Sequence, residues 1–370
     1  MKIGVVGGGN GGLTVALTLL DQTYGDDVEI EIYYDPNIPI EKVGQGSLVN
    51  FVGILSDVLG MDWYSNPIDA TFKTGILYED WGKKNDKFFH PFPMNYTAIH
   101  YSPNKLREYM IENNICKFIE QNVSDCNELD CDYVFDCRGT PKDFSYYNML
   151  KNPLNSVLLG KSDDVDAHQH WTRCIATPDG WMFSIPGKRN TNYGYLYNDN
   201  CTSKTEAEEN LADLYDIQGT EHIQFKNYLA RRPIQNDKVI LNGNRLMFIE
   251  PLEASSVETY FRWTSLVCEW IFDGRSKRSV LQELVTDVEE VQNFILWHYA
   301  NGSRYATMFW SEAETMARNH SYDESFFDII RSAKSNSRHE LVYNHEDSYG
   351  HWYGTSFKNW IDNTHLLTDM

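Results

Sequence analysis

The chain opens with the stretch MKIGVVGGGNGGLTVALTLL, residues 1–20, which decides the fold. A short β-branched run, Lys2 to Val6, leads into glycines and then into an apolar stretch with helical spacing, Gly11 to Leu20. A second apolar run, Val28 to Tyr34, follows it. Strand, helix and strand at these lengths are typical of a β-α-β unit. The sequence therefore predicts an α/β fold built on a parallel sheet.

The glycines of this stretch form a dinucleotide fingerprint. Gly7, Gly9 and Gly12 give G-x-G-x-x-G between strand and helix, and Asp35 ends the next strand. The first glycine permits a tight turn, the second lets the backbone approach a pyrophosphate, and the third lets helix and strand pack closely. The helix start faces the anion, and Asp35 accepts from the ribose. The alternative, a glycine turn without ligand, is disfavoured by this context; the motif leaves FAD and NAD both open.

Composition excludes several classes of protein. The 370 residues carry 32 Lys+Arg and 53 Asp+Glu, a net charge of −21, which disfavours nucleic acid and anionic membrane surfaces as partners. No apolar run reaches the length of a membrane span, and the N-terminus lacks the apolar stretch of a signal peptide, so we expect a cytoplasmic protein. The seven cysteines are odd in number and form no C-x-x-C pair, so we expect neither disulfides nor structural zinc.

Further along the chain, Tyr133 to Phe135 predicts another strand of the sheet, ending at Asp136-Cys137-Arg138-Gly139. Residues 171–198 alternate as strands do, and residues 256–272 and 279–300 have helical periodicity. The last seventy residues mix short helical pieces with aromatic and polar stretches.

Four further segments carry a resemblance, and their order and spacing count for more than any one of them. They are Val43-Gly44-Gln45-Gly46-Ser47; Ala70-Thr71-Phe72-Lys73 before Gly75-Ile76-Leu77-Tyr78; Gly180-Trp181-Met182-Phe183-Ser184-Ile185-Pro186 before Tyr193-Gly194-Tyr195-Leu196-Tyr197; and Phe248-Ile249-Glu250-Pro251-Leu252-Glu253-Ala254-Ser255-Ser256. Over residues 1 to roughly 300 the chain resembles the flavin-dependent halogenases of the tryptophan halogenase family.

The resemblance implies an architecture and a reaction. The fold would be a Rossmann-like FAD-binding fold of the flavin hydroxylase, or monooxygenase, type with an inserted substrate-binding sheet and a helical C-terminal segment. Residues 1–300 would form the FAD-binding body, with the substrate sheet at about 160–235, and residues 301–370 the C-terminal segment. FAD supplied reduced by a separate flavin reductase, O2 and a halide ion would give hypohalous acid, which halogenates an electron-rich aromatic small molecule.

The resemblance also implies functional residues, at the positions of this chain that match the family's motifs. Lys73 matches the lysine that holds hypohalous acid or becomes a haloamine, and Glu253 matches the glutamate that orients the electrophile or takes the arene proton. Ser255 and Ser256 match halide contacts, and no metal site is implied. The tunnel residues would be Trp181, Phe183, Ile185 and Pro186. The FAD contacts would be Gly7, Gly9, Gly12, Asp35, Gly44, Gly46, Ser47, Gly139, Gly243, Asn244 and Val257.

The residues alone leave alternatives. Ser255 with Glu258 three residues later predicts a capping box, so this helix start could be capped with nothing bound, or its amides could bind a halide. Lys73 lies in a strand-like segment, where a solvated edge lysine is the ordinary reading. As a catalyst it would react as a desolvated neutral amine, which Glu253 opposes, or polarise the O–X bond as an ammonium; both routes stay open.

Some positions depart from the family pattern: Gln45, Ala254 and Phe183 replace a glutamate, a serine and a tryptophan. At Asn242-Gly243-Asn244 the chain has asparagine where related flavoproteins often carry an aspartate at the ribityl chain, a position that varies among halogenases. The chain is also short for the family, which predicts a more open substrate site. Two other functions therefore stay in view, a flavin-dependent aromatic hydroxylase and a non-catalytic flavin-binding protein. The pair His168 and His170 lacks a third ligand, so we expect no metal there. Monomer and homo-oligomer are both open.

Overall fold

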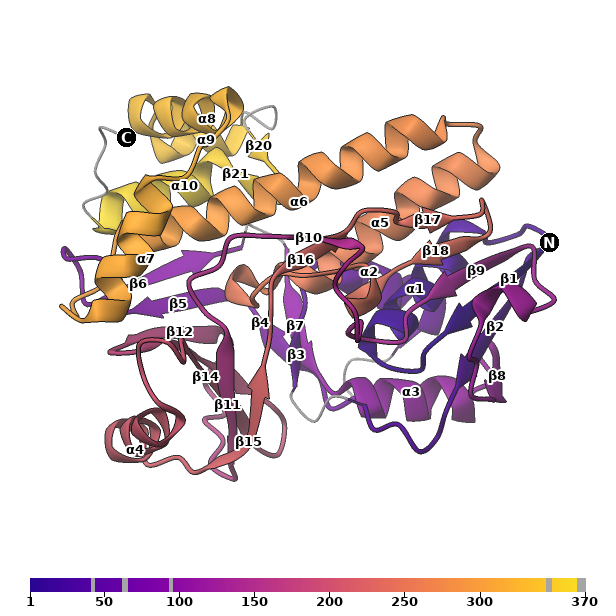
Figure 1. Cartoon of the computed structure of the whole chain (residues 1–370), viewed down its shortest axis with the longest axis horizontal. Coiled ribbons are helices and arrows are strands. Elements are labelled where there is room, and N and C mark those ends of the chain that lie inside the picture. Colours follow the sequence, from indigo (N-terminus) through magenta and orange to yellow (C-terminus); the bar gives the residue numbers. More distant parts are fainter. Residues whose placement is uncertain (41–43, 62–65, 93–95, 344–347, 365–370) are drawn as a thin grey trace. The chain divides into compact units, whose positions relative to one another are not determined.

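The structure is a computed structural model of the chain, and it describes residues 1–40, 44–61, 66–92, 96–343 and 348–364. The chain forms two compact units, each assembled from three separate segments. Figure 1 labels the helices and strands along the chain. Unit 1 consists of Met1–Phe72, Thr97–Leu150 and Asn227–Thr286. Unit 2 consists of Lys73–Tyr96, Lys151–Lys226 and Asp287–Met370. The functional division into residues 1–300 and 301–370 stays a prediction, since these units follow compactness alone.

Unit 1 is built on a sheet whose strand order, within the described residues, is β17-β18-β9-β1-β2-β8. The predicted β-α-β unit is confirmed, because β1 pairs in parallel with β2 and also with β9. All neighbours in this sheet are parallel except β17 and β18. The elements are β1 (Lys2–Val6), β2 (Glu29–Tyr34), β8 (Lys117–Glu120), β9 (Tyr133–Asp136), β17 (Ile234–Gln235) and β18 (Val239–Leu241).

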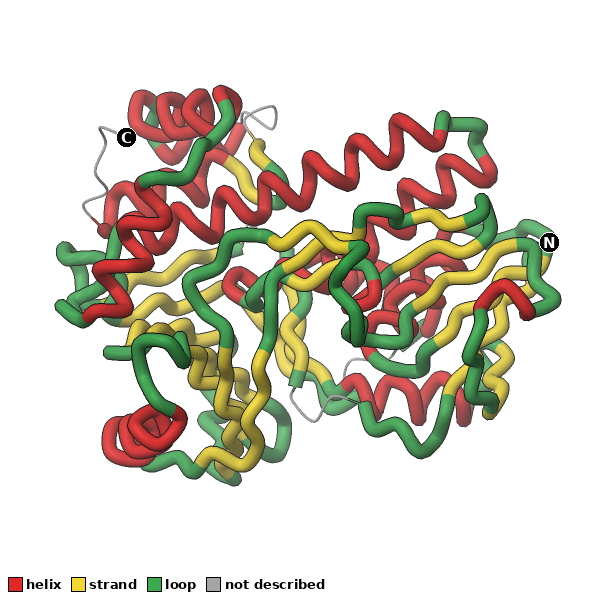
Figure 2. Tube along the Cα trace, in the orientation of Figure 1, coloured by secondary structure: helices red, strands yellow, loops and turns green. Residues whose placement is uncertain are grey.

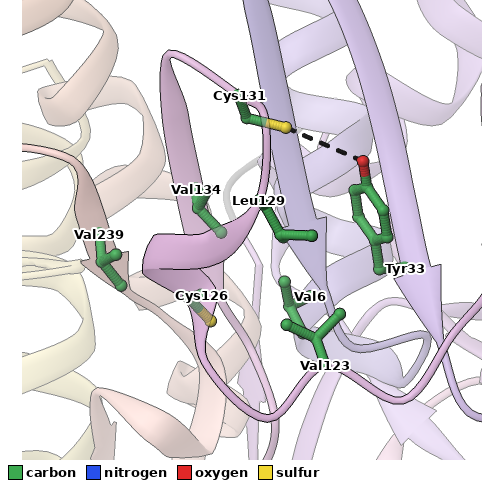
Figure 3. Packing of buried hydrophobic residues seen from close by; sticks show 8 residues of the cluster. All are labelled: Val6, Tyr33, Val123, Cys126, Leu129, Cys131, Val134 and Val239. Atoms are coloured by element: carbon green, nitrogen blue, oxygen red, sulfur yellow. Dashed lines mark hydrogen bonds between the residues drawn. The ribbon is translucent and has the colours of Figure 1, made fainter.

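One hydrophobic cluster of unit 1 joins strand side chains to the segment that leads into β9 (Figure 3). Four strands contribute one residue each, and residues 123–131 supply the rest, including the short 3-10 helix η1 (Cys126–Glu128). The Tyr33 hydroxyl lies 3.9 Å from the Cys131 sulfur. The cluster comprises Val6, Tyr33, Val123, Cys126, Leu129, Cys131, Val134 and Val239.

The helices of unit 1 cluster around α1 (Asn10–Gln22), which packs against α2, α3 and most extensively α5. Their bounds are α2 (Val49–Leu59), α3 (Pro103–Glu112) and α5 (Ser255–Phe272). Two small three-stranded sheets are also present. One has the strand order β3 (Gln45–Gly46), β7 (Ala98–Tyr101), β4 (Thr71–Lys73), and the other the order β10 (Tyr147–Met149), β16 (Tyr228–Ala230), β19 (Met247–Phe248).

Unit 2 holds the sheet expected for the substrate, with strand order β15-β11-β14-β13-β12-β5-β6. The predicted alternation at residues 171–198 corresponds to β12, β13 and β14, which pair antiparallel. Helix α4 (Lys204–Tyr215) covers one face, where Ala207 and Leu211 pack on Met182 and Tyr195. The strands are β5 (Gly75–Glu79), β6 (Lys87–Pro91), β11 (Ser156–Ser162), β12 (Thr172–Thr177), β13 (Gly180–Pro186), β14 (Thr191–Tyr197) and β15 (Gly219–Gln224).

The C-terminal part is helical, as expected, and the helices alternate with short loops and a small hairpin (Figure 2). Its aromatic side chains form a core with strand β5. The ring centres of His298 and Trp360 lie 4.0 Å apart, and those of Trp360 and Tyr78 lie 4.6 Å apart. None of the described helices is long and apolar enough to cross a membrane. The elements are α6 (Lys277–Ala300), α7 (Met308–Arg318), α8 (Glu324–Ser335), α9 (Arg338–Tyr343), β20 (Ser348–Tyr349), β21 (Trp352–Tyr353) and α10 (Gly354–Thr364).

Candidate functional site

The glycine loop between β1 and α1 has no room for side chains. Gly7 has φ +128°, and a Cβ there would lie 2.4 Å from the carbonyl oxygen of Cys137 at the end of β9. A Cβ on Gly12 would lie 1.9 Å from the carbonyl oxygen of Gly7. The first and third glycines thus meet the steric demands of a tight turn and of close helix–strand packing.

The start of α1 can receive an anion. Its N-cap is Gly9, and no side chain caps the helix, so the amides of the first turn stay available. The helix also lies against a second glycine segment, because a Cβ on Gly11 would lie 2.9 Å from the Gly243 Cα. Asn10 is held by the Tyr101 hydroxyl, which donates to its side-chain oxygen at 2.6 Å. The loop is therefore fixed on two sides.

Asp35 directly follows β2, as the fingerprint requires, and its carboxylate is already oriented. Oδ1 accepts from the amide of Asn37 at 2.9 Å and Oδ2 from Asn122 Nδ2 at 2.9 Å. The Asn37 backbone hydrogen bond, together with the two asparagine side chains, lowers the pKa of Asp35 below its usual value. The group is an ionised acceptor suited to ribose hydroxyls. Asn122 carries no signal in the sequence and reaches this place only through the fold.

Three further glycines lie in unit 1 at the expected positions. Gly46 belongs to β3 and pairs with His100 of β7, and the buried Ser47 exchanges hydrogen bonds with Ile99. Gly139 follows β9 with φ +79°, and a Cβ there would meet no atom within 4 Å. Gly44 precedes β3 and is half-buried. The space beside Gly139 is open for a ligand.

The segment Asn242 to Asn244 is fastened to α5. Asn242 is buried, donates to Thr264 Oγ1 at 2.9 Å and accepts from the Gly243 amide at 2.7 Å. Gly243 has φ +58°. The side-chain oxygen of Asn244 accepts from the Tyr260 hydroxyl at 2.7 Å. The side chains of Asn242 and Asn244 are therefore both held by hydrogen bonds to α5, a role that the sequence alone does not predict.

The turn before α5 has an unusual backbone. Glu253 (φ +68°) and Ala254 (φ +56°) both adopt left-handed conformations, which non-glycine residues rarely do. Both Glu253 and Ser255 are buried. A left-handed backbone costs free energy at a residue other than glycine. Two such residues in succession therefore indicate that the surrounding structure holds this turn in one conformation.

The predicted capping box at this helix is wrong. Ala254 is the N-cap and Ser255 already belongs to the helix, so no side chain caps the first turn. Glu258 instead accepts from Asn50 Nδ2 of α2 at 2.6 Å. A capping box needs the serine at an extended N-cap position, and here the left-handed residue moves the start one residue earlier. The first-turn amides at Ser255, Ser256 and Val257 are thus not capped by a side chain.

Lys73 is the last residue of β4 and is fully buried, whereas its neighbour Phe72 is 53% exposed. Its side-chain nitrogen, Nζ, lies 5.2 Å from the centre of the Phe92 ring. The alternative of a solvated edge lysine is wrong. Complete burial is uncommon for lysine, because removing its charge from water is costly.

Strand β13, which contains the predicted tunnel residues, directs its side chains alternately to the two faces of the sheet. Met182 faces α4, and Trp181, Phe183 and Ile185 alternate with it. Trp181 is fully buried, and its indole nitrogen has no hydrogen-bond partner in the described part of the chain. The Phe183 ring lies across Gly194, where a Cβ would come within 2.2 Å of it. Pro186, the last tunnel candidate, is buried at the end of the strand.

The two histidines considered as metal ligands do not belong to the groups of residues described above. His168 and His170 are exposed. Within the ranges described, no three His, Cys, Asp or Glu side chains are grouped to hold a metal ion. All seven cysteines are free thiols.

A family model described as tryptophan halogenase matches residues 2–127 and 112–357, which is most of the chain. The chain belongs to this family. It is accordingly an enzyme, a flavin-dependent halogenase, as the resemblance implied.

Two curated relatives and one solved structure place this halogenase within the family. Tryptophan 7-halogenase KtzQ of Kutzneria sp. (strain 744) is 21% identical over 97% of this chain and 86% of its own. Tryptophan 7-halogenase RebH of Lentzea aerocolonigenes is 21% identical over 84% of this chain and 78% of its own. The flavin-dependent halogenase Xcc4156 from Xanthomonas campestris superposes with a TM-score of 0.81 at 16% identity, covering 100% of this chain and 89% of that one. This likeness confirms the predicted fold class.

Proposed function

We propose that this halogenase binds FAD on unit 1, receives it reduced from a separate flavin reductase, and halogenates an electron-rich aromatic small molecule. The observation that carries the proposal is the complete burial of Lys73 in a family member whose glycine loop is shaped for a dinucleotide. KtzQ and RebH are named as tryptophan halogenases, which makes tryptophan the first arene to test.

The residues of unit 1 fit the cofactor. A Cβ on Gly7 or Gly12 would collide with backbone, the α1 amides are uncapped, and the space beside Gly139 is open. Gly9, Gly12 and the α1 start would hold the pyrophosphate and Asp35 the ribose, with Gly44, Gly46, Ser47, Gly243, Asn244 and Val257 as further contacts. Bound reduced FAD supplies, with O2, the two-electron oxidation of halide: FADH2 + O2 + X⁻ + H⁺ gives FAD + HOX + H2O.

The start of α5 would hold the halide. A halide is a small anion that needs hydrogen-bond donors, and the uncapped first turn of an 18-residue helix offers amides at its positive end. Ser255 and Ser256 are the residues of this turn that match the family's halide contacts. The absence of a side-chain cap supports this assignment, since a capping oxygen would compete for the same amides.

Lys73 would assist transfer of the halogen to the arene by one of two routes. As an amine it attacks HOX, an N–X bond forms and water leaves; the arene then takes X and the amine is restored. As an ammonium it donates a hydrogen bond to the oxygen of HOX and makes X more electrophilic. In either route the ring carbon gains X and loses a proton. Glu253, a buried carboxylate candidate, would orient the electrophile or accept that proton.

Trp181, Phe183, Ile185 and Pro186 would line the path of the electrophile within unit 2. A buried apolar wall protects hypohalous acid from water and from wasteful reaction with other side chains. The predicted more open substrate site would admit arenes besides tryptophan.

Product analysis tests the function. The protein is incubated with FAD, an unrelated flavin reductase, NADH and O2, with tryptophan, indole or phenol, in chloride, bromide or iodide separately. Mass spectrometry should show substitution of one hydrogen by the halogen supplied, dependent on the reductase. A hydroxylated product, or NADH oxidation without reductase, would contradict the proposal in favour of a hydroxylase. FAD binding without product across the panel would favour a non-catalytic flavin-binding protein.

A further inference from the structure

Arg107 lies beside the glycine loop although it belongs to α3, far along the chain. Its Cδ is 3.5 Å from the position that a Cβ on Gly8 would take. Gly8 stands between the first two glycines of the fingerprint, where a bound pyrophosphate passes the backbone. The arginine is half-buried. The stem of a long cationic side chain thus lies against the residue between the first two glycines.

Tyr34 holds this arginine in place. The guanidinium carbon lies 5.5 Å from the centre of the Tyr34 ring, a stacking distance for a cation over an aromatic face. The ring is itself fixed, because it meets Phe118 edge-on at 5.9 Å and its hydroxyl donates to Glu120 at 3.0 Å. Tyr34 also contacts the loop, since its Cβ is 2.9 Å from the position that a Cβ on Gly8 would take, and it directly precedes Asp35, the expected ribose acceptor.

Among the residues that the structure describes, Arg107 has no acidic partner. The hydrogen bond that it makes within this part of the chain is a long one, 3.5 Å to the Asn104 side chain. In the described ranges no carboxylate comes within 4 Å of its guanidinium, whereas its helix neighbour Lys105 pairs with Glu108 at 2.7 Å. The chain carries 53 acidic residues against 32 basic ones, so a positive charge beside the glycine loop is the one that a bound anion would need. Its donors remain available for an external anion.

We propose that Arg107 binds the pyrophosphate of FAD opposite the α1 amides; this inference rests on the proposed function of the glycine loop. The amides of the loop supply dipoles but no full charge, and the phosphates enter a protein of net charge −21. A planar guanidinium supplies that charge and a pair of parallel donors matched to phosphate oxygens. Tyr34 keeps the fork oriented, so little rotamer freedom is lost on binding.

The test measures FAD affinity rather than turnover. Quenching of flavin fluorescence gives the Kd of the full chain in potassium acetate, which avoids halide, for the wild type, Arg107→Ala, Arg107→Lys and Lys105→Ala. Lys105→Ala is the matched control, because it removes one positive charge from the same helix. We expect Arg107→Ala to weaken FAD binding by about 10- to 100-fold and to reduce its salt dependence. Arg107→Lys should recover part of the loss, and Lys105→Ala should stay within about twofold.

Each other outcome has a defined meaning. If Arg107→Ala binds FAD as the wild type does and only its thermal unfolding temperature falls, Arg107 merely anchors α3 on Tyr34, and the inference is overturned while the proposed function stands. If Lys105→Ala weakens binding as much as Arg107→Ala, the effect is one of general charge and the inference is again overturned. If the wild type binds no FAD, both fail together.

Discussion

Glu31 shows at the level of a single residue how this sheet tolerates a buried charge. It lies in β2 beneath Lys2 and Lys117, which pair with it at 2.9 and 2.5 Å, and the Tyr33 hydroxyl also donates to it. Burial raises the pKa of Glu31, but the hydrogen bonds from Lys117, Tyr33 and Lys2 outweigh it and lower the pKa to about 2. The cluster therefore favours the ionised carboxylate.

This pKa predicts a pH dependence of stability. The pKa of Glu31 in the folded chain is below its ordinary value of 4.5, so its contribution is complete above pH 4.5 and is lost as the pH falls towards 2. Urea unfolding of the wild type and Glu31→Gln at several pH values checks this. The wild type should be more stable at pH 7 by roughly 1–2 kcal/mol, since the half-exposed lysines are partly screened. A difference that does not shrink towards low pH would contradict the assignment.

Glu253 gives a residue-scale prediction about catalysis. Glu253→Gln keeps the volume of the side chain but removes its basicity, so halogenation should slow by about 10²- to 10⁴-fold while the Kd for FAD stays the same. Single-turnover product formation with prereduced FAD measures the rate. The control is Glu258→Gln in the first turn of α5, which keeps an acceptor for Asn50 and should retain most activity. Equal rates for Glu253→Gln and the wild type would exclude the role.

At the scale of elements, the sequence predicted what periodicity and glycine chemistry determine. The β1-α1-β2 unit, the strands at residues 171–198 and the long helices all appear. The start of α5 was mispredicted, because the left-handed backbone at Ala254 comes from packing and not from any preference of alanine. Asn122 and Arg107 were missed for a related reason: each reaches the glycine fingerprint through a distant element of the fold.

The left-handed N-cap of α5 makes a prediction about substitutions. Ala254→Val puts a β-branched side chain at φ +56° and should lower the free energy of unfolding by about 1–2 kcal/mol, whereas Ala254→Gly should cost little. Chemical denaturation of both variants measures this. Equal decreases in the free energy of unfolding for the two variants would contradict the prediction, because the left-handed backbone would then not be what limits the side chain at this position.

Two glycines in helices should respond in opposite ways to alanine. A Cβ on Gly12 would lie 1.9 Å from backbone, so Gly12→Ala should abolish FAD binding or folding. Gly53 is exposed within α2, and a Cβ there would meet nothing within 4 Å, so Gly53→Ala should stabilise the protein by about 0.5–1 kcal/mol. Thermal unfolding and FAD titration of the two variants form one comparison. A stable, FAD-binding Gly12→Ala protein would contradict the account of the loop.

At the scale of the whole molecule, both compact units are discontinuous in the sequence. The glycine loop, Glu253 and the start of α5 belong to unit 1, whereas Lys73 and the Trp181 strand belong to unit 2. The first passage of the chain from unit 1 to unit 2 falls at Lys73, which ends β4. Neither unit is a continuous segment that could be expressed alone, so every functional test needs the full chain.

The central claim of the proposed function is that halogen reaches the arene through Lys73, either as a haloamine or as hypohalous acid held by its hydrogen bond. Its most direct test measures, in one reaction, the halogenated arene and the hypohalous acid that escapes, the latter as sulfoxide formed from added methionine. Lys161→Ala, which removes an exposed lysine of unit 2, is the matched control. We predict that the wild type and Lys161→Ala halogenate the arene, whereas Lys73→Ala still oxidises methionine in a halide-dependent way and makes almost no halogenated product. Arene halogenation by Lys73→Ala at the wild-type ratio to sulfoxide would contradict the claim.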